Sequence, residues 1–202
     1  MDAMELRDDE IEALGTRGYF LRDGLLGAAQ ARTVHNEALE RAQSGALRPA
    51  SIRRGGDRTL DVGTRGDLIS WVLPEQGSAL GVLWERFAAL GEALSAGAYL
   101  GLGKFDLQLA LYPGGGARYA RHVDAFPGQS NRRATAIYYA NPDWQPAHGG
   151  VLRLYPEGRP VDVEPVLDRL LVFLSERIEH EVLPVHAPRL ALTAWYYGRD
   201  AG

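Results

Sequence analysis

Cysteine is absent from all 202 residues of the chain. Disulfide bonds and thiolate metal ligands are therefore excluded, and a reducing, cytoplasmic setting is natural. The first residues, MDAMELRDDEIEAL, have neither the basic nor the apolar segment of a secretory signal. No apolar run approaches the roughly 18–20 residues of a membrane span. We expect a cytoplasmic protein without a membrane segment.

Positive charge is also in slight deficit. The chain has 22 Lys and Arg against 26 Asp and Glu, a net charge of -4. This balance disfavours nucleic acid or an anionic membrane as a general partner. The hydrophobic fraction of 46% is typical of a globular domain, and the length suffices for one core. We expect a single domain over residues 1–202, and a monomer.

The first hundred residues carry mainly helical patterns. They predict helices over residues 8–14 and 28–43 and from residue 74 onward, with a short strand at 19–21. The third helix has an apolar stripe at helical spacing, formed by Leu80, Leu83, Trp84, Phe87, Leu90 and Leu94. Such a stripe predicts that this helix packs on the outside of a sheet.

From residue 104 the pattern changes to short β segments separated by Gly and Pro turns. The clearest segments are FDLQLALY, ATAIYYAN, GVLRLY, DRLLVFLS and RLALTAWYY. Strands at this spacing predict a sandwich or jelly roll. Helices first and strands later predict an α+β, mainly β fold with helices against one face.

Residues 51–65 (SIRRGGDRTLDVGTR) connect the helical part to the β part. The segment is long and polar for a connector, and loops of this length are usually functional or disordered. Two interpretations stay open: a mobile hairpin, or a segment that covers a substrate.

Three residues of the β part suggest a metal centre. His122 and Asp124 are two positions apart, so on a strand their side chains point the same way. With His180 they form a set of two imidazoles and one carboxylate, which is typical of non-haem Fe(II). Such a set leaves three coordination positions for a chelating co-substrate and dioxygen. His186 is the alternative third ligand and ranks second, because it adjoins a predicted turn.

The last strand, RLALTAWYY, alternates between two faces. Arg189, Thr193 and Trp195 share one face, and aliphatic residues occupy the other. If the aliphatic face packs under the helices, Arg189 points inward, which is costly unless an anion neutralises it. A dicarboxylate co-substrate is one such anion; an internal Asp or Glu is the alternative. Tyr112 and Tyr139 either donate hydroxyls to the same carboxylate or simply pack in the core.

Five motifs occur in a characteristic order: YPGGGARYARHVD, IYYANPDW, GGVLRLYPEG, VEPVLDRLLVFLS and HEVLPVHAPRLALTAWYY. Together they resemble the catalytic domain of the prolyl 4-hydroxylases, above all the hypoxia-sensing enzymes of animals and their bacterial relatives. The resemblance covers about residues 104–198 and extends upstream to RGDLISW at residues 65–71.

The resemblance implies a distorted double-stranded β-helix, a cupin-like jelly roll with N-terminal helices packed on one sheet. Residues 1–103 would supply these helices and the substrate loop, and residues 104–198 the catalytic β core. It implies an Fe(II)- and 2-oxoglutarate-dependent dioxygenase that 4-hydroxylates a prolyl residue of a cytosolic protein and releases succinate and CO2. O2 would be the second co-substrate, ascorbate a candidate reductant and elongation factor Tu the favoured protein substrate.

The resemblance also implies roles for individual residues. The catalytic set would be Arg189 and the three metal ligands His122, Asp124 and His180. The 2-oxoglutarate contacts would come from Tyr112, Tyr139, Leu152, Arg189 and Thr193. The substrate contacts would come from Trp195, beside the prolyl ring, and from Arg65 and Asp67, which would anchor a mobile loop.

Two departures from the family pattern limit what is carried over. The segment AFPGQSNRR after Asp124 is about one residue longer than in the animal enzymes, so Arg132 and Arg133 receive no role, and loop 51–66 has its own sequence. Two other functions stay open. One is an oxygenase acting on a free amino acid or another small molecule, and the other is a catalytically inactive binding module.

Overall fold

The computed structural model describes residues 4–50, 52–54, 57–59, 65–126, 128 and 130–199. The helices in these residues are α1 (Asp8–Thr16), α2 (Ala28–Gln43), α3 (Ala79–Gly97) and the 3-10 helix η1 (Pro146–His148). The strands are β1 (Tyr19–Asp23), β2 (Arg48–Pro49), β3 (Ile52–Arg54), β4 (Asp57–Thr59), β5 (Leu68–Val72), β6 (Leu102–Tyr112), β7 (Ala117–His122), β8 (Arg132–Tyr139), β9 (Leu152–Tyr155), β10 (Val161–Val163), β11 (Arg169–Leu174), β12 (Glu179–Val185) and β13 (Arg189–Gly198).

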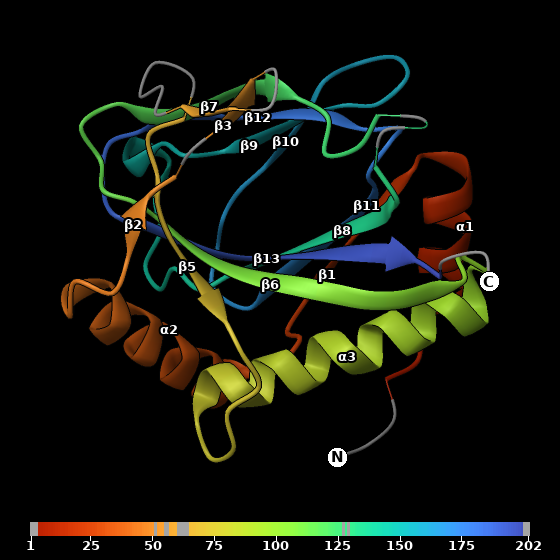
Figure 1. Ribbon diagram of the computed structural model, residues 1–202, viewed down its shortest axis with the longest axis horizontal. Helices are drawn as coiled ribbons and strands as arrows, with labels where there is room; N and C mark the ends of the chain where they lie inside the picture. Colours follow the sequence, from red (N-terminus) through yellow and green to blue (C-terminus); the bar gives the residue numbers. More distant parts are fainter. Residues whose placement is uncertain are drawn as a thin grey trace.

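Two antiparallel sheets face each other, as Figure 1 shows. The larger sheet has the order β1-β11-β8-β13-β6-β5-β2, and the smaller has the order β10-β9-β12-β7. Strands that are distant in sequence lie side by side in both sheets, which is the mark of a jelly roll. The predicted mainly β fold, with helices on one sheet, is confirmed.

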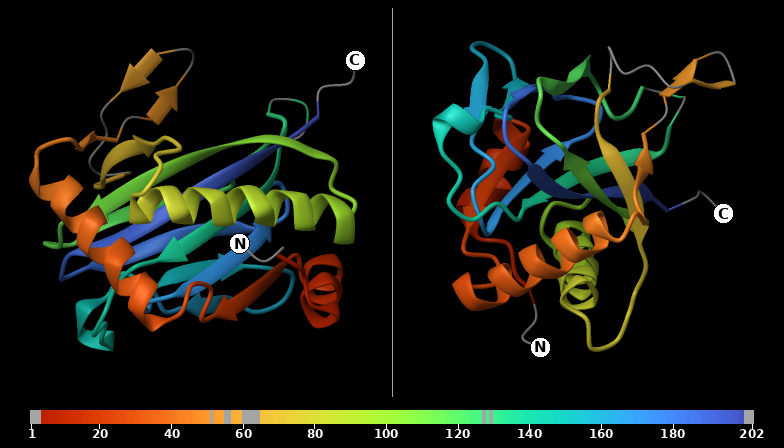
Figure 2. Two further views of the ribbon diagram at one scale, coloured as in Figure 1. Left: turned by 90° about the horizontal axis from the view of Figure 1, so that it is seen from below. Right: turned by 90° about the vertical axis from the view of Figure 1, so that its left-hand side faces the viewer.

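Helices α2 and α3 cover the outer face of the larger sheet (Figure 2). The predicted stripe of α3 faces the sheet: Leu83 and Leu94 are fully buried, although Trp84 is only partly so. Each buried side chain of this size contributes roughly 1.5–3 kcal/mol. The Tyr196 hydroxyl of β13 donates to the Phe87 carbonyl of α3 at 2.7 Å. The helix is therefore fixed to the strand that carries much of the inner surface.

Helix α3 begins later than the sequence pattern predicted. It starts at Ala79 rather than at residue 74, because the Ser78 hydroxyl caps it by accepting from the Gly81 amide at 2.9 Å. The Glu37 carboxylate of α2 accepts from two further amides of this first turn. The N-terminal helix is longer than predicted, since α1 continues through Gly15 to Thr16.

A second apolar core lies between the two sheets and opens into the candidate site. Strands β1, β2 and β5 from the N-terminal half join the larger sheet; of these, only β1 was expected. In the connector, the backbone of β3 and β4 pairs as a small hairpin, and residues 51, 55–56 and 60–64 lie outside the described residues. Its role over a substrate stays a prediction, as does the division of the domain at residue 103. No helix in the described part of the chain has the length and apolar character needed to cross a bilayer.

The N-terminal helix is attached to the sheet through one buried carboxylate. Glu10 of α1 is 1% exposed and pairs with Arg7 and with Arg22 of β1. Burial raises the pKa of Glu10, but hydrogen bonds and charge from Arg22 and Arg7 outweigh it and hold the pKa below its ordinary value of 4.5. The ionised carboxylate is therefore part of what stabilises the folded state.

We expect Glu10→Gln to lower the free energy of unfolding by about 2 kcal/mol at pH 7. Because the folded carboxyl binds its proton more weakly than the unfolded one, this contribution is fully present above about pH 4.5 and fades below it. Urea unfolding of variant and wild type from pH 7 to pH 3.5 checks this. The exposed Glu12→Gln is the control. A difference that grew as the pH fell would contradict the assignment.

Candidate metal centre and adjoining pocket

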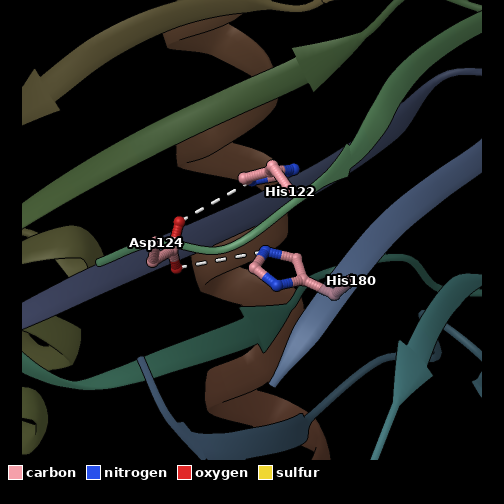
Figure 3. A group of neighbouring side chains, drawn as sticks. All are labelled: His122, Asp124 and His180. Atoms are coloured by element: carbon pink, nitrogen blue, oxygen red, sulfur yellow. Dashed lines mark ion pairs between the residues drawn. The ribbon is translucent and has the colours of Figure 1, made fainter. Parts of the chain in front are cut away.

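His122, Asp124 and His180 converge, and each offers one ligand atom within 4.8 Å of the others. The Asp124 carboxylate lies between the rings: Oδ1 is 3.7 Å from Nε2 of His122, and Oδ2 is 4.0 Å from Nε2 of His180 (Figure 3). The Asp124 side chain is 7% exposed. A buried group of two imidazoles and one carboxylate is a donor set that suits Fe(II).

The smaller sheet brings the two histidines together. His122 ends β7 and is the direct cross-strand partner of His180 in β12, and their ring centroids are 4.3 Å apart. The alternation argument assumed that Asp124 and His122 share a strand, but they do not. Asp124 lies in the bend two residues after β7 ends. The turn of the chain, rather than the pleat of a strand, aims the carboxylate at the histidines.

Local hydrogen bonds assign the protons of both rings. Nδ1 of His122 lies 2.8 Å from the Ala120 carbonyl, and Nδ1 of His180 lies 3.2 Å from the Ile178 carbonyl. Because a carbonyl can only accept, each Nδ1 carries a proton, so the lone pair of the neutral ring is on Nε2. Burial, followed by the charge of His180, lowers the pKa of His122 to about 4. This ring therefore stays neutral at pH 7, as a metal ligand must.

The carboxylate of Asp124 stays ionised in spite of its burial. Burial raises its pKa, but the two histidines, a hydrogen bond from Thr135 and the charge of Arg132 hold it below the ordinary value. The Thr135 hydroxyl donates to Oδ2 at 2.7 Å. The neutral His122 ring and the ionised Asp124 carboxylate are thus in the protonation states that coordination requires.

Arg189 lies next to this centre, at the start of β13. It is 3% exposed, and Nε donates to the Gly150 carbonyl at 2.8 Å. A Cβ at Gly150, whose φ is +72°, would lie 2.7 Å from Cδ of Arg189, so glycine makes room for the arginine. Within the described residues no carboxylate forms an ion pair with Arg189, which leaves a buried cation that an anion could neutralise.

Two tyrosines enclose the guanidinium of Arg189. The rings of Tyr112 and Tyr139 are centred 5.0 and 5.1 Å from it. The Tyr139 hydroxyl is buried and has no hydrogen-bond partner among the described residues, and burial raises its pKa to about 12, so it is a donor. A buried donor with no acceptor is costly. A carboxylate bound to Arg189 would satisfy it.

One pocket contains most of the residues that the sequence singled out. The predicted site residues that line it are Arg65, Asp67, Tyr112, His122, Asp124, Leu152, His180, Arg189, Thr193 and Trp195. On β13 the predicted alternation is correct, since Leu190, Leu192 and Ala194 face the helices. Tyr139 is fully buried, directly behind this lining.

The rim of the pocket combines aromatic rings with arginines. Trp195 packs edge-on against Trp71, with ring centroids 6.2 Å apart, and its buried indole N–H finds no hydrogen-bond partner in the described part of the chain. Arg65 forms a bidentate ion pair with Asp67 at 2.7 and 2.9 Å, and its guanidinium covers the Tyr119 ring at 4.7 Å. These contacts fix the end of the connector against β7.

The other histidines lie outside the centre. His186, the alternative ligand, is exposed and does not belong to the converging group. His35 places Nδ1 2.7 Å from the Ala140 carbonyl and helps to hold α2 on the sheet. His148 contacts the Gln145 amide within its turn.

Sequence reasoning missed some contributors to the site. Arg132, given no role, places its guanidinium 4.7 Å from the centre of the Trp195 ring and donates to the Asp124 carbonyl at 3.3 Å. Tyr119 stacks on His122 at 3.9 Å between ring centroids. The position of Tyr119 inside YPGGGARYARHVD was the available signal. For Arg132 the irregular pairing at the start of β8 hid which face it occupies.

The comparisons with known proteins agree with this geometry. The model of the 2OG-Fe(II) oxygenase superfamily matches residues 107–197. Mouse (Mus musculus) prolyl hydroxylase EGLN3 is 37% identical over 193 residues, covering 91% of this chain and 80% of the relative. The chain spans 46–58% of the length of the mammalian Egl nine homolog 1 proteins that it also matches.

Two solved structures are similar over nearly the whole chain. A Pseudomonas putida prolyl-4-hydroxylase has a TM-score of 0.85 and 37% identity, covering 95% of this chain and 98% of that one. A Trichoplax adhaerens prolyl hydroxylase, in complex with a hypoxia inducible factor oxygen degradation domain peptide, has a TM-score of 0.86 and 31% identity, with coverages of 95% and 88%. The resemblance read from the sequence motifs is confirmed: the chain belongs to the 2OG-Fe(II) oxygenase superfamily, as a prolyl-hydroxylase-like member.

Proposed function

We propose that this chain is an Fe(II)- and 2-oxoglutarate-dependent dioxygenase that hydroxylates C4 of a prolyl residue in a protein. In the overall reaction, one oxygen atom of O2 enters the substrate C–H bond, and the other enters 2-oxoglutarate as it becomes succinate and CO2. The observation that carries the proposal is the placement of a buried cation, Arg189, in the same pocket as the His122, Asp124 and His180 group.

The donor set fits the metal and the pocket fits the co-substrate. His122 and His180 would hold Fe(II) through Nε2, and Asp124 would hold it through a carboxylate oxygen. The distal carboxylate of 2-oxoglutarate would bind Arg189 and the Tyr139 hydroxyl, with Tyr112, Leu152 and Thr193 around its chain. When bound, iron and 2-oxoglutarate supply the oxidising chemistry.

The side chains of the protein orient the reactants and exclude water. Arg189 and Tyr139 would fix the far end of the co-substrate, which sets the direction of its metal-binding end. Trp195 would form a wall beside the prolyl ring, and the Arg65–Asp67 pair would anchor the segment that covers it. The burial of His180 and of the Asp124 side chain limits the access of bulk water to a reactive centre.

A protein is the favoured substrate for two reasons. The Trichoplax relative was solved with a peptide fragment, and the pocket of this chain opens beside an exposed Trp71, which is 47% accessible. Elongation factor Tu is the candidate that the sequence resemblance supplies, and ascorbate is the candidate reductant. A monomer acting in the cytoplasm is the expected form.

His122→Ala should abolish turnover and weaken metal binding by more than the roughly 10–100-fold that loss of a supporting contact costs. Calorimetric titration with Mn(II), a redox-inert substitute for Fe(II), measures the binding directly. The exposed His186→Ala is the matched control and should bind as the wild type does. Equal losses in the two variants would show that His186, the alternative third ligand, binds the metal.

Arg189→Met should raise the dissociation constant of 2-oxoglutarate by roughly 30-fold or more, because a buried charge pair is lost. The same change should leave the thermal midpoint without 2-oxoglutarate unchanged or higher, since the buried cation has no carboxylate partner among the described residues. Thermal unfolding of the Mn(II) form, with and without 2-oxoglutarate, measures both effects.

Arg153→Met is the control for this experiment. Arg153 pairs with Asp162 on the surface at 2.7 Å, so its loss should leave the response to 2-oxoglutarate intact. An Arg189 variant with undiminished 2-oxoglutarate binding would show that an internal acid, rather than the co-substrate, is the partner of the guanidinium.

The reaction is tested in lysate from cells that lack the protein. Purified chain, Fe(II), 2-oxoglutarate, ascorbate and air should add one oxygen to proline in a tryptic peptide, and His180→Ala should not. Purified elongation factor Tu, assayed separately, tests the named candidate. Turnover of 2-oxoglutarate without hydroxyproline would favour a small-molecule substrate, and no turnover at all would favour a binding module.

A further inference from the structure

Two buried hydroxyl groups stand behind the carboxylate of Asp124. Thr135 of β8 donates to Oδ2 at 2.7 Å, and the Ser175 hydroxyl lies 2.9 Å from the Thr135 hydroxyl. Thr135 and Ser175 are both fully buried. Thr135 lies in β8 and Ser175 directly follows β11, both in the larger sheet, whereas the two histidines come from the smaller one. Asp124 therefore lies between groups from both sheets.

The direction of these hydrogen bonds follows from the count of protons. An ionised carboxylate can only accept, so the single hydroxyl proton of Thr135 goes to Asp124. The oxygen of Thr135 is then an acceptor, and Ser175 must donate to it. Ser175 is itself fixed by its backbone, since its amide donates to the Arg133 carbonyl at 3.1 Å. The result is a directed chain from Ser175 through Thr135 to the carboxylate.

The row of hydrogen bonds from Ser175 through Thr135 makes the two oxygens of Asp124 unequal. Oδ2 accepts a charge-assisted hydrogen bond, while Oδ1 accepts no hydrogen bond from the described residues and lies 3.7 Å from Nε2 of His122. A carboxylate that used both oxygens for a metal would fill one more coordination position. The hydroxyl pair disfavours this, which preserves the three positions that a chelating co-substrate and O2 need.

Resting on the metal centre of the proposed function, we propose that Thr135, oriented by Ser175, is a positioning residue that keeps Asp124 a one-oxygen ligand. Neither hydroxyl touches the pocket, so the pair acts only through the carboxylate. Loss of the hydroxyl pair frees Oδ2 and loosens the side chain of Asp124. It should therefore alter the affinity of the site for a metal and the coordination number of the bound metal.

The experiment uses the full chain and Co(II) alone, with no co-substrate. Thr135→Val removes the hydroxyl at nearly constant shape, Thr135→Ser keeps it, and Ser175→Ala removes its donor. We expect Thr135→Val to weaken Co(II) binding by roughly 10–100-fold and to change the intensity of the visible Co(II) bands, which reports coordination number. Thr135→Ser should resemble the wild type in both readouts, and Ser175→Ala should fall between the two.

Tyr196→Phe is the matched control, since it removes another buried hydroxyl, bound to the Phe87 carbonyl far from the metal. The proposal is overturned if Thr135→Val keeps wild-type affinity and bands, if Thr135→Ser loses as much as Thr135→Val, or if Tyr196→Phe loses as much as either. Should Thr135→Val fail to fold, the Co(II) affinities of Ser175→Ala and Thr135→Ser are compared. A loss in Ser175→Ala but not in Thr135→Ser supports the proposal, and equal affinities overturn it. If a His122→Ala variant bound Co(II) as the wild type does, the assignment of the metal centre in the proposed function would itself be wrong.

Discussion

The site depends on one constraint: the buried negative charge of Asp124 is only partly compensated by the protein and needs a cation beside it. The Thr135 hydroxyl of the larger sheet donates to the carboxylate, and two imidazoles of the smaller sheet place Nε2 3.7 and 4.0 Å from it. An unpaired carboxylate in such a place would cost several kcal/mol. The spacing of the two sheets, the register that sets His122 opposite His180 and the turn after β7 all serve this balance.

The same principle, with the opposite sign, governs the neighbouring end of the pocket. Arg189 is a buried cation enclosed by tyrosine rings and a carbonyl, without an internal carboxylate among the described residues. The fold thus places an anionic centre and a cationic centre in one pocket and leaves each incompletely compensated. A metal cation would compensate the first centre, and the distant carboxylate of a ligand that chelates this metal would compensate the second.

Much of this could be predicted from the sequence, because strand alternation is a local property. It correctly separated the two faces of β13 and identified Arg189 as inward-facing. Other features depend on contacts between distant residues or on irregular backbone, which alternation does not predict. Thr135 and Ser175 are 40 positions apart, Asp124 is aimed by a turn, and Arg132 follows an irregular pairing with β13. The start of α3 was misplaced because its cap, and not its apolar pattern, decides it.

The two-sided character of β13 has a consequence for how such a protein can diversify. Every second side chain of this central strand faces the pocket, and the alternate ones face the helical core. Substitutions on the inner face can therefore alter what is bound while the packing of β13 against the helices is left unchanged. New substrate preferences can then arise in small steps along a single strand.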